Sequence, residues 1–241
     1  MKALLLPCFA FLMITLVNAQ DLAVPDAIKK ELETVALIGA NGESIRCKVH
    51  YPSNYTKETA YPVFLGISGG GQSEPVVEYC YAAWFRSHHF DNYITIMPIN
   101  DKAGSFRDYG AEAIAEVMGA IKNHFNVKEN GWIAGGTSNG GVAAFNFVAS
   151  EPALFKGAVV APGAVSDAIQ INEGWKHLTI ILAYGEEDAD DWINAATASK
   201  NLLSEHVKKV ETMVLAGQGH MLPIDFDIDV IYDRYFKLVK S

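Results

Sequence analysis

Short apolar runs alternate with helical patterns along most of this chain. Residues 61–67 (YPVFLGI), 93–98 (YITIMP) and 178–184 (LTIILAY) are almost entirely apolar, as expected of buried strands. Residues 111–125 instead place apolar side chains three and four positions apart, which predicts an amphipathic helix. Short apolar strands that alternate with helices are typical of a parallel sheet covered by helices on both faces.

Two further β-type stretches come first, at residues 34–38 and 44–51, and the turn-forming residues 39–42 (GANG) separate them. This spacing predicts an antiparallel hairpin. The remaining expected strands are 132–135, 157–161 and 210–216, and the remaining expected helices are 140–149, 192–206 and 226–239. No linker, repeat or low-complexity tract interrupts the pattern. We therefore expect one α/β domain over residues 20–241, with a mostly parallel twisted sheet, an N-terminal antiparallel hairpin and helices on both faces.

The first twenty residues differ from the rest of the chain. Lys2 gives a positive start, residues 3–17 are predominantly apolar, and Ala19 is a small residue that suits a cleavage site. A membrane anchor is the competing interpretation, but a helix needs about 20 apolar residues to cross a bilayer, and this run is shorter. The pattern predicts a cleaved signal peptide over residues 1–19 and hence a secreted or periplasmic protein.

The charge of the chain narrows the choice of partners. The formal net charge is −9, from 28 acidic and 19 basic residues. Nucleic-acid binding relies on a patch or run of Lys and Arg, and the sequence contains no such run. We therefore expect neither nucleic acids nor anionic membranes as partners.

Two cysteines lie outside the predicted signal peptide, Cys47 and Cys80. An oxidising compartment allows a disulfide between them. Both also lie beside apolar residues, which is typical of small buried thiols. The sequence leaves both interpretations open.

A glycine-rich turn lies between the expected strand at 132–135 and the expected helix at 140–149. It contains G-x-S-x-G at residues 136–140, with Ser138 at its centre. Such a tight turn exposes the Ser hydroxyl and directs the helix N-terminal amides at developing negative charge. A phosphate loop is the alternative, but neither the G-x-G-x-x-G nor the Walker pattern fits this segment. We therefore predict that Ser138 is a nucleophile.

A serine nucleophile needs a base, and the base needs an acid that orients it. His220 ends the loop GQGH after the last expected strand, whereas the other histidines lie in expected strands, helices or their junctions. Five carboxylates follow the strand at 178–184. Asp188 is the preferred acid because it lies within the loop, whereas Asp190 and Asp191 immediately precede a helix, where Asp commonly caps free amides. Asp191 is the second candidate.

The order Ser138, Asp188, His220, each after its own strand, resembles that of the α/β-hydrolase fold over essentially the whole mature chain. More narrowly, the chain resembles secreted serine esterases of the putative-esterase and polyhydroxyalkanoate-depolymerase type. Residues 51–55 (YPSNY) and 61–63 (YPV) are similar to the hairpin and first parallel strand of such enzymes, and GQGH is similar to their His loop. The resemblance implies no metal and no organic cofactor.

The resemblance also nominates an oxyanion hole. In the family, one amide comes from the residue after the nucleophile, here Asn139. The other comes from the loop after the first parallel strand, usually written HGGG. Residues 68–72 (SGGGQ) follow that strand here, and Gly70 matches the amide donor. Ser68 stands where the family usually has a His that buttresses the loop.

Other groupings carry less weight. Asp225, Asp227 and Asp229 resemble the start of a calcium loop, but the Gly and the Glu that such a loop needs are replaced, so we expect a solvated helix start. His88 and His89 suggest a metal, but adjacent histidines on a helix point about 100° apart, and no ligand spacing accompanies them. Two interpretations stay open for Trp84, Trp175 and Trp192: they line a pocket, or they pack in the core.

Taken together, these features predict a serine carboxylesterase in which Ser138, Asp188 and His220 form an acyl-enzyme and then hydrolyse it. Only sixteen residues separate Ala161 from Leu178, too few for a cap domain. We therefore expect an open site that favours short-chain, small soluble or polymer-end esters. The alternatives are a serine peptidase of the prolyl-oligopeptidase type and a non-catalytic binding protein on the same fold.

Overall fold

The computed structural model describes residues 22–241. The signal peptide predicted for residues 1–19 lies outside this range. Within residues 22–241, no helix has both the length and the apolar character that crossing a bilayer requires.

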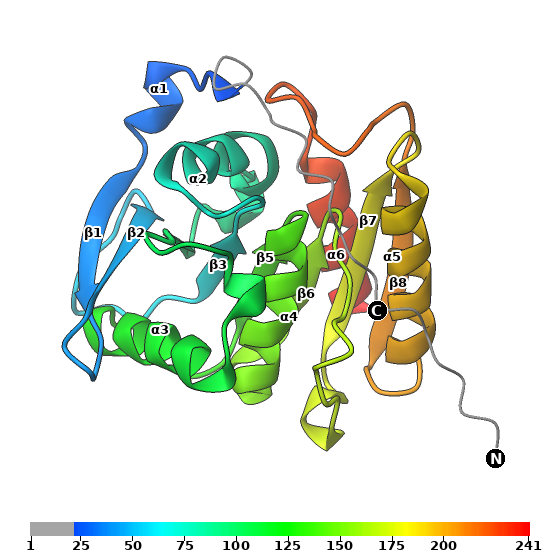
Figure 1. The fold of residues 1–241 in the computed structure, drawn as a ribbon. Coiled ribbons are helices and arrows are strands. Elements are labelled where there is room, and N and C mark those ends of the chain that lie inside the picture. The colour runs from blue at the N-terminus through cyan, green and yellow to red at the C-terminus, as the bar shows by residue number, and fades with distance from the viewer. Residues whose placement is uncertain (1–21) are drawn as a thin grey trace.

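The described residues form one α/β unit in which strands and helices alternate (Figure 1). The strands are β1 (Glu33–Ile38), β2 (Ser44–His50), β3 (Val63–Ile67), β4 (Ile94–Pro98), β5 (Trp132–Gly136), β6 (Phe155–Val160), β7 (Thr179–Gly185) and β8 (Lys209–Leu215). The α-helices are α1 (Asp26–Lys29), α2 (Glu74–Cys80), α3 (Ala111–His124), α4 (Asn139–Ser150), α5 (Asp190–Leu203) and α6 (Asp229–Lys240). Short turns are the π-helical η2 (Tyr81–Phe85) and the 3₁₀-helical η3 (His88–Phe90), η4 (Phe106–Asp108), η5 (Pro152–Leu154) and η6 (Glu173–Trp175).

The strands pair in one eight-stranded sheet with the order β1-β2-β4-β3-β5-β6-β7-β8. β2 runs antiparallel to both β1 and β4, and the other neighbouring strands are parallel. The predicted hairpin and the mostly parallel sheet of a single domain are therefore confirmed. Because β3, β5, β7 and β8 are parallel to one another, the loops that follow them leave the same edge of the sheet.

Alternate residues of the buried strands point to opposite faces of the sheet. In β3, Leu65 lies in the core with residues of α3, α4 and α5, whereas Phe64 lies in the core with residues of α2, η2 and α6. Figure 1 shows α3, α4 and α5 in front of the sheet and α6 behind it. Both faces are therefore covered, as the continuous apolar runs predict.

The observed helices differ from the predicted ones in several places. α5 covers Asp190–Leu203 instead of residues 192–206, and the short α1 has no counterpart among the predicted helices. α6 begins at Asp229, later than the predicted start at residue 226, and the side chain of Asp227 accepts a hydrogen bond from the Asp229 amide at 3.2 Å. The sequence pattern predicts no helix in the segment that forms α2 and η2. All five residues of η2 are buried, so no polar face alternates with an apolar one there and no helical period is visible.

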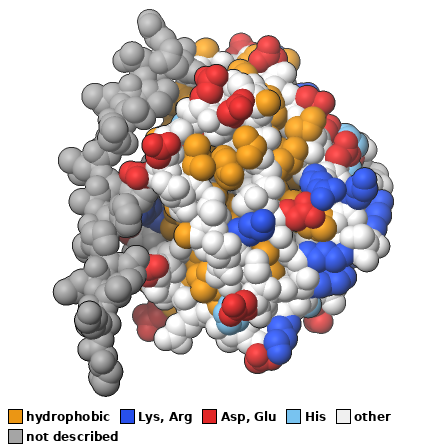
Figure 2. Space-filling model, turned by 90° about the vertical axis from the view of Figure 1, so that its right-hand side faces the viewer, with side chains coloured by type: hydrophobic (Ala, Val, Ile, Leu, Met, Phe, Trp, Pro, Cys, Tyr) orange, Lys and Arg blue, Asp and Glu red, His pale blue; other side chains and the backbone are white. Residues whose placement is uncertain are grey.

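The face over α5 and β8 has a mixed surface. Figure 2 shows acidic, basic and hydrophobic side chains together on this face. Leu202 of α5 and Val214 of β8 are among the exposed hydrophobic residues.

Candidate active site

Ser138 lies in the turn between β5 and α4, with φ 55° and ψ −126°. Its backbone amide donates a hydrogen bond to the Pro162 carbonyl at 2.8 Å. The flanking glycines are needed because a Cβ on Gly136 would lie 2.4 Å from the Gly140 carbonyl oxygen, and a Cβ on Gly140 would lie 2.1 Å from that of Ile67. This turn therefore has the tight geometry that the G-x-S-x-G pattern predicts.

The structure brings Ser138, His220 and Asp188 together. Ser138 Oγ lies 3.0 Å from His220 Nε2, and His220 Nδ1 lies 2.9 and 3.2 Å from the two carboxylate oxygens of Asp188. The Asp188 side chain is fully buried, whereas that of His220 is 31% exposed. With its proton on Nδ1 facing the carboxylate, the imidazole can accept the Ser138 hydroxyl proton at Nε2.

Backbone contacts hold the loop after β7 against the loop after β8. The Glu187 amide donates to the Gln218 carbonyl at 2.8 Å, and the Gly217 amide donates to Glu186 Oε2 at 3.0 Å. The two loops approach so closely at Gly185 that a Cβ there would lie 2.2 Å from the Gln218 carbonyl oxygen. These contacts fix the distance between the Asp188 and His220 loops without using either of those side chains.

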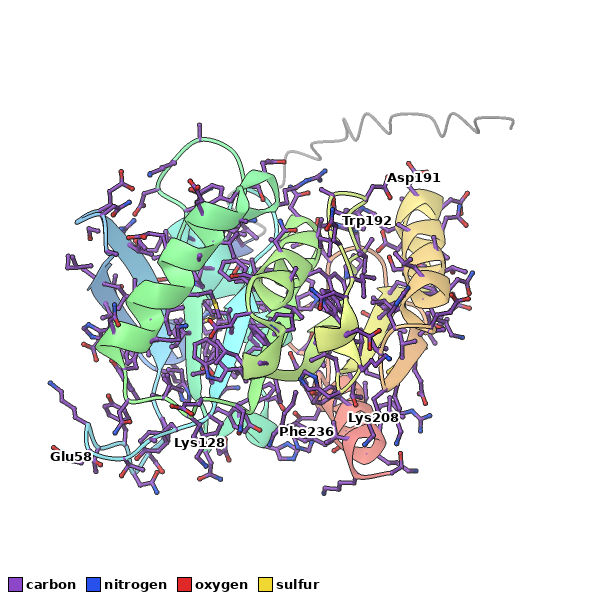
Figure 3. The ribbon with its side chains drawn as sticks, turned by 90° about the horizontal axis from the view of Figure 1, so that it is seen from below. Glu58, Lys128, Asp191, Trp192, Lys208 and Phe236 are labelled. Carbon is purple, nitrogen blue, oxygen red and sulfur yellow. The ribbon has the colours of Figure 1, made fainter. Side chains whose placement is uncertain are left out.

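The structure separates the five carboxylates that compete for the acid position. Asp188 contacts His220, and its Oδ1 also accepts a hydrogen bond from the Ala189 amide at 2.7 Å. Asp190 and Asp191 were expected to precede a helix as caps, but they lie in the first turn of α5 and neither caps it with its side chain. Asp191 is exposed, and Figure 3 places it at the outer end of α5.

The predicted oxyanion loop passes beside the nucleophile. A Cβ on Gly69 would lie 3.4 Å from the Ser138 Cβ. Asn139 is the first residue of α4, so its amide is one of the free N–H groups at that helix N-terminus. Its side-chain Nδ2 donates to the Gly70 carbonyl at 3.3 Å. Gly69 thus lies beside Ser138, and Gly70 contacts the side chain of Asn139, the residue that follows Ser138.

Gln72 holds this loop in shape, although no sequence motif identifies it. It is fully buried and has φ 58°, a left-handed conformation that is uncommon outside glycine. Its Nε2 donates to the carbonyls of Ser68 at 2.9 Å and Gly70 at 2.8 Å, and its Oε1 accepts from the Phe106 amide at 2.9 Å. These bonds brace the loop from within, whereas the family usually has a His at the position of Ser68. The only sequence signal was a polar residue directly after three glycines.

Arg107 of η4 is a second residue beside the site that no motif identifies. Its Nη1 donates to Asn139 Oδ1 at 2.8 Å, and its carbonyl accepts from Asn146 Nδ2 of α4 at 3.1 Å. The guanidinium therefore orients the side chain of the residue that follows the nucleophile. It also places a positive charge at the edge of the site.

Of the four tryptophans, Trp84, Trp175 and Trp192 divide between the core and the site. Trp84 and Trp175 are buried in the core. Trp192 is half-buried, and its ring centroid lies 5.2 Å from that of His220. In Figure 3, Trp192 lies on the side of α5 that faces the neighbouring elements. It is therefore the tryptophan positioned to form a wall of the site.

The two cysteines are buried free thiols, so the disulfide interpretation is wrong for this structure. Burial raises the pKa of the Cys47 thiol to about 12 and that of the Cys80 thiol to about 11. Thiolates are the reactive form of cysteine, so neither side chain is a competing nucleophile.

The aspartates at residues 225–229 and the histidines at 88 and 89 were expected to form no site, and the structure agrees with this only in part. Asp225 and Asp227 are exposed, as a solvated helix start predicts, but Asp229 is not simply solvated, because it pairs with His88. The expectation that His88 and His89 point apart is wrong, since their ring centroids lie 4.2 Å from each other. Both rings turn toward α6, which the helical-wheel argument does not take into account.

Comparison with known proteins identifies a family for this chain. A model of the putative esterase family matches residues 38–223, which is more than half of the chain. The comparison with curated proteins gives no match.

Solved structures with a similar fold include two esterases and a peptidase. A thermostable esterase has a TM-score of 0.60 at 15% identity, and the match covers 78% of this chain and 56% of that one. A ferulic acid esterase has a TM-score of 0.62 at 13% identity, covering 87% and 97%. Dipeptidyl peptidase 4 of Porphyromonas gingivalis has a TM-score of 0.60 at 10% identity, covering 87% and 35%. At these identities the likeness shows a shared fold alone.

Proposed function

Because the chain belongs to the putative esterase family, we propose that it is a serine carboxylesterase that hydrolyses carboxylic esters through an acyl-enzyme. One observation carries this proposal: the continuous hydrogen-bonded series from Ser138 Oγ through His220 to the buried carboxylate of Asp188. A neutral imidazole between a hydroxyl and a buried carboxylate is the arrangement that makes a serine nucleophilic.

In this mechanism Ser138 Oγ attacks the ester carbonyl carbon while His220 Nε2 takes the hydroxyl proton. The backbone amides of Asn139 and Gly70 stabilise the oxyanion of the tetrahedral intermediate. The intermediate collapses, the C–O bond to the alcohol breaks, and His220 gives its proton to the departing alkoxide. Water, deprotonated by His220, then attacks the acyl carbon. The bond from that carbon to Ser138 Oγ breaks, Oγ takes the proton back from His220, and the acid is released. Asp188 stabilises the imidazolium in both half-reactions.

The segment between β6 and β7 supports a preference for small or polymer-end esters. Residues 162–177 hold only the short turn η6, and Val165, Ile169 and Ile171 pack against the core instead of forming a cap. An uncapped site has no lid to open at an interface. Short acyl chains fit such a site, whereas each methylene of a long chain would gain little of the roughly 0.8 kcal/mol that its burial is worth.

Two other functions fit the same fold. A serine peptidase would use the same three residues, but this chain spans only 35% of the one peptidase with which we compare its fold. A non-catalytic binding protein would not need the Ser138–His220–Asp188 hydrogen bonds. Export from the cytoplasm stays a prediction that rests on residues 1–19.

Labelling with a fluorophosphonate tests the proposal directly, since such reagents phosphonylate activated serines. We expect one label per chain, located on Ser138 by mass spectrometry, and no label on Ser138→Ala. A panel of p-nitrophenyl esters should then give the highest kcat/KM at about two to four acyl carbons, with no increase in activity at the critical micelle concentration. Labelling at another residue, or faster cleavage of peptide amides than of esters, would overturn the proposed function.

A further inference from the structure

A second cluster of chemically active side chains lies away from the candidate active site, in the η3–α6 corner. We use this name for residues His88–Phe90 of η3 and the residues of α6 that pack against them. η3 comes just before β4, near the amino-terminal ends of the parallel strands, whereas Ser138 follows the carboxyl end of β5. The corner is therefore built from other elements than the loops that carry Ser138, Asp188 and His220.

Three of its side chains converge on one point. His88 Nδ1 lies 2.5 Å from Asp229 Oδ2. One nitrogen of each imidazole and one oxygen of Asp229 all lie within 4.8 Å of one another. Ligand atoms around a tetrahedral zinc ion lie about 3.3 Å apart, given bonds of about 2.0–2.1 Å. Small rotations of exposed or half-buried side chains are enough to reach that spacing.

The surroundings hold these groups in place. The His89 ring stacks on Phe236, with centroids 4.6 Å apart and an interplanar angle of 19°, and Figure 3 shows Phe236 on α6. The Ser87 hydroxyl donates a hydrogen bond to Asp229 Oδ1, and His89 Nε2 lies 2.8 Å from Asp233 Oδ1. Metal-binding His and Asp side chains commonly have such partners, which orient the ligands.

We propose that His88, His89 and Asp229 form a binding site for a divalent transition-metal ion, with zinc as the best match. Two imidazole nitrogens and one carboxylate oxygen suit Zn²⁺, whereas Ca²⁺ and Mg²⁺ prefer all-oxygen sites. Asp233 orients His89, and water completes the coordination.

A cavity of about 340 Å³ beside the corner gives solvent and ions a route to the site. His88 and Asp229 line it, together with polar residues such as Arg86 and Thr95. The ion would join η3 to α6 across 141 positions of the sequence. Its role would be to stabilise this packing, because no residue of the proposed esterase mechanism takes part.

Zinc titration of the metal-free full chain by calorimetry tests the site. We expect one Zn²⁺ per chain, a rise in Tm on binding, and no comparable binding of Ca²⁺ or Mg²⁺. His88→Gln and Asp229→Asn should each lower the affinity at least tenfold, and Asp233→Asn should lower it by about tenfold. His124→Ala removes an exposed histidine elsewhere and is the matched control, which should bind like the wild type.

A second arm separates this site from the active site, where His220 and Asp188 could also hold zinc. His220→Ala should bind zinc with unchanged affinity, and His88→Gln should cleave esters at the wild-type rate. Because His88 is exposed, its replacement leaves the fold intact, and unchanged Tm without zinc verifies this. Absence of zinc binding at millimolar concentration, or binding that disappears in His220→Ala and persists in His88→Gln, would overturn the proposal. Absence of esterase activity in the wild-type protein would contradict the proposed function and leave the zinc result standing.

Discussion

Two regions of this molecule assemble reactive side chains in opposite ways. At the catalytic edge, which we define as the loops after β3, β5, β7 and β8, each functional residue follows its own strand, and backbone contacts set the loop positions. In the η3–α6 corner, side chains alone bridge residues 141 positions apart. The first arrangement can be recognised from local sequence patterns. The second joins distant residues without a local sequence pattern, so only the folded structure shows it.

Burial also differs between the two regions. The Asp188 carboxylate is fully buried and contacts both His220 and the Ala189 amide. The His88 side chain is 60% exposed, although it too pairs with an aspartate. Exposed ion pairs contribute little to stability, whereas a buried carboxylate that loses its partners is costly. Substitutions should therefore have large effects at the catalytic edge and small ones in the corner, unless the corner holds a metal.

The largest expected effect separates two aspartates that lie three positions apart. Asp188→Asn should lower kcat on an activated ester by about 10⁴, because the imidazole loses the carboxylate that fixes its tautomer. Asp191→Asn is the matched control and should change kcat little, since it removes only an exposed charge near the N-terminus of α5. Steady-state kinetics on both variants would show an error in the assignment of the acid if the two effects were exchanged.

The next effect concerns the backbone of the catalytic edge. A Cβ at residue 140 would lie 2.1 Å from the Ile67 carbonyl oxygen and 2.2 Å from that of Ser68, and backbone atoms cannot easily move away. We expect Gly140→Ala to lower the free energy of unfolding by about 3 kcal/mol and to reduce activity, because the oxyanion loop must shift.

Gly119→Ala in α3 is the control for this substitution. Nothing lies within 4 Å of a Cβ at residue 119, and alanine favours a helix over glycine by up to about 1 kcal/mol. Denaturant unfolding should therefore show that Gly119→Ala is slightly more stable than the wild type. A Gly140→Ala variant of wild-type stability would contradict the close approach seen at the elbow.

Much of the catalytic edge could be predicted because its signals are local. The glycines on both sides of Ser138 indicate a tight turn. A polar loop directly after an apolar strand indicates the edge of the sheet. Asp188 could be preferred to Asp191 on its position relative to the helix alone. The sheet could be predicted from the apolar runs alone. A strand that is buried on both faces is a continuous apolar run, which can be recognised without knowing which strand pairs with it.

The parts that could not be predicted depend on contacts between distant segments. Gln72 braces its own loop, but its Oε1 accepts a hydrogen bond from the Phe106 amide. No sequence pattern links residues 72 and 106. Arg107 reaches Asn139 only because η4 packs beside α4. The rings of His88 and His89 were expected to diverge from the helix period alone, yet both pair with aspartates of α6.

A smaller effect tests whether Gln72 positions the oxyanion loop. Gln72→Met keeps the volume but removes the bonds that Gln72 donates to the carbonyls of Ser68 and Gly70 and the bond that it accepts from the Phe106 amide. We expect kcat to fall by about 10- to 100-fold with little change in KM, because oxyanion stabilisation acts in the transition state. Removing a whole donor costs about 10²–10³, and here the donor is only displaced. A lower Tm with unchanged kcat would mean that Gln72 serves the fold and not the oxyanion hole.

The smallest expected effect lies near the η3–α6 corner, at His50 at the end of β2. His50 lines the same cavity as His88. Burial lowers the pKa of His50 below its usual value, and the nearby positive charge of Arg86 adds to this, whereas Glu31 and Asp91 partly offset it. The folded state therefore binds the proton less readily than the unfolded state does. The stabilisation that results is fully present above the unfolded pKa of about 6.5 and is lost as the pH falls through the lower pKa of the folded protein.

His50→Gln removes this titration. We expect the wild type to lose less than about 1 kcal/mol of stability relative to His50→Gln between pH 7.5 and pH 5, because the side chain is only partly buried. Urea unfolding at each pH, with EDTA present so that no metal contributes, measures the difference in the free energy of unfolding between the two proteins. The titration of carboxylates is common to both proteins and cancels in this difference. A difference that does not change with pH would show that His50 titrates alike in the folded and unfolded chains. A difference of the opposite sign would show that Glu31 and Asp91 outweigh burial at this end of the sheet.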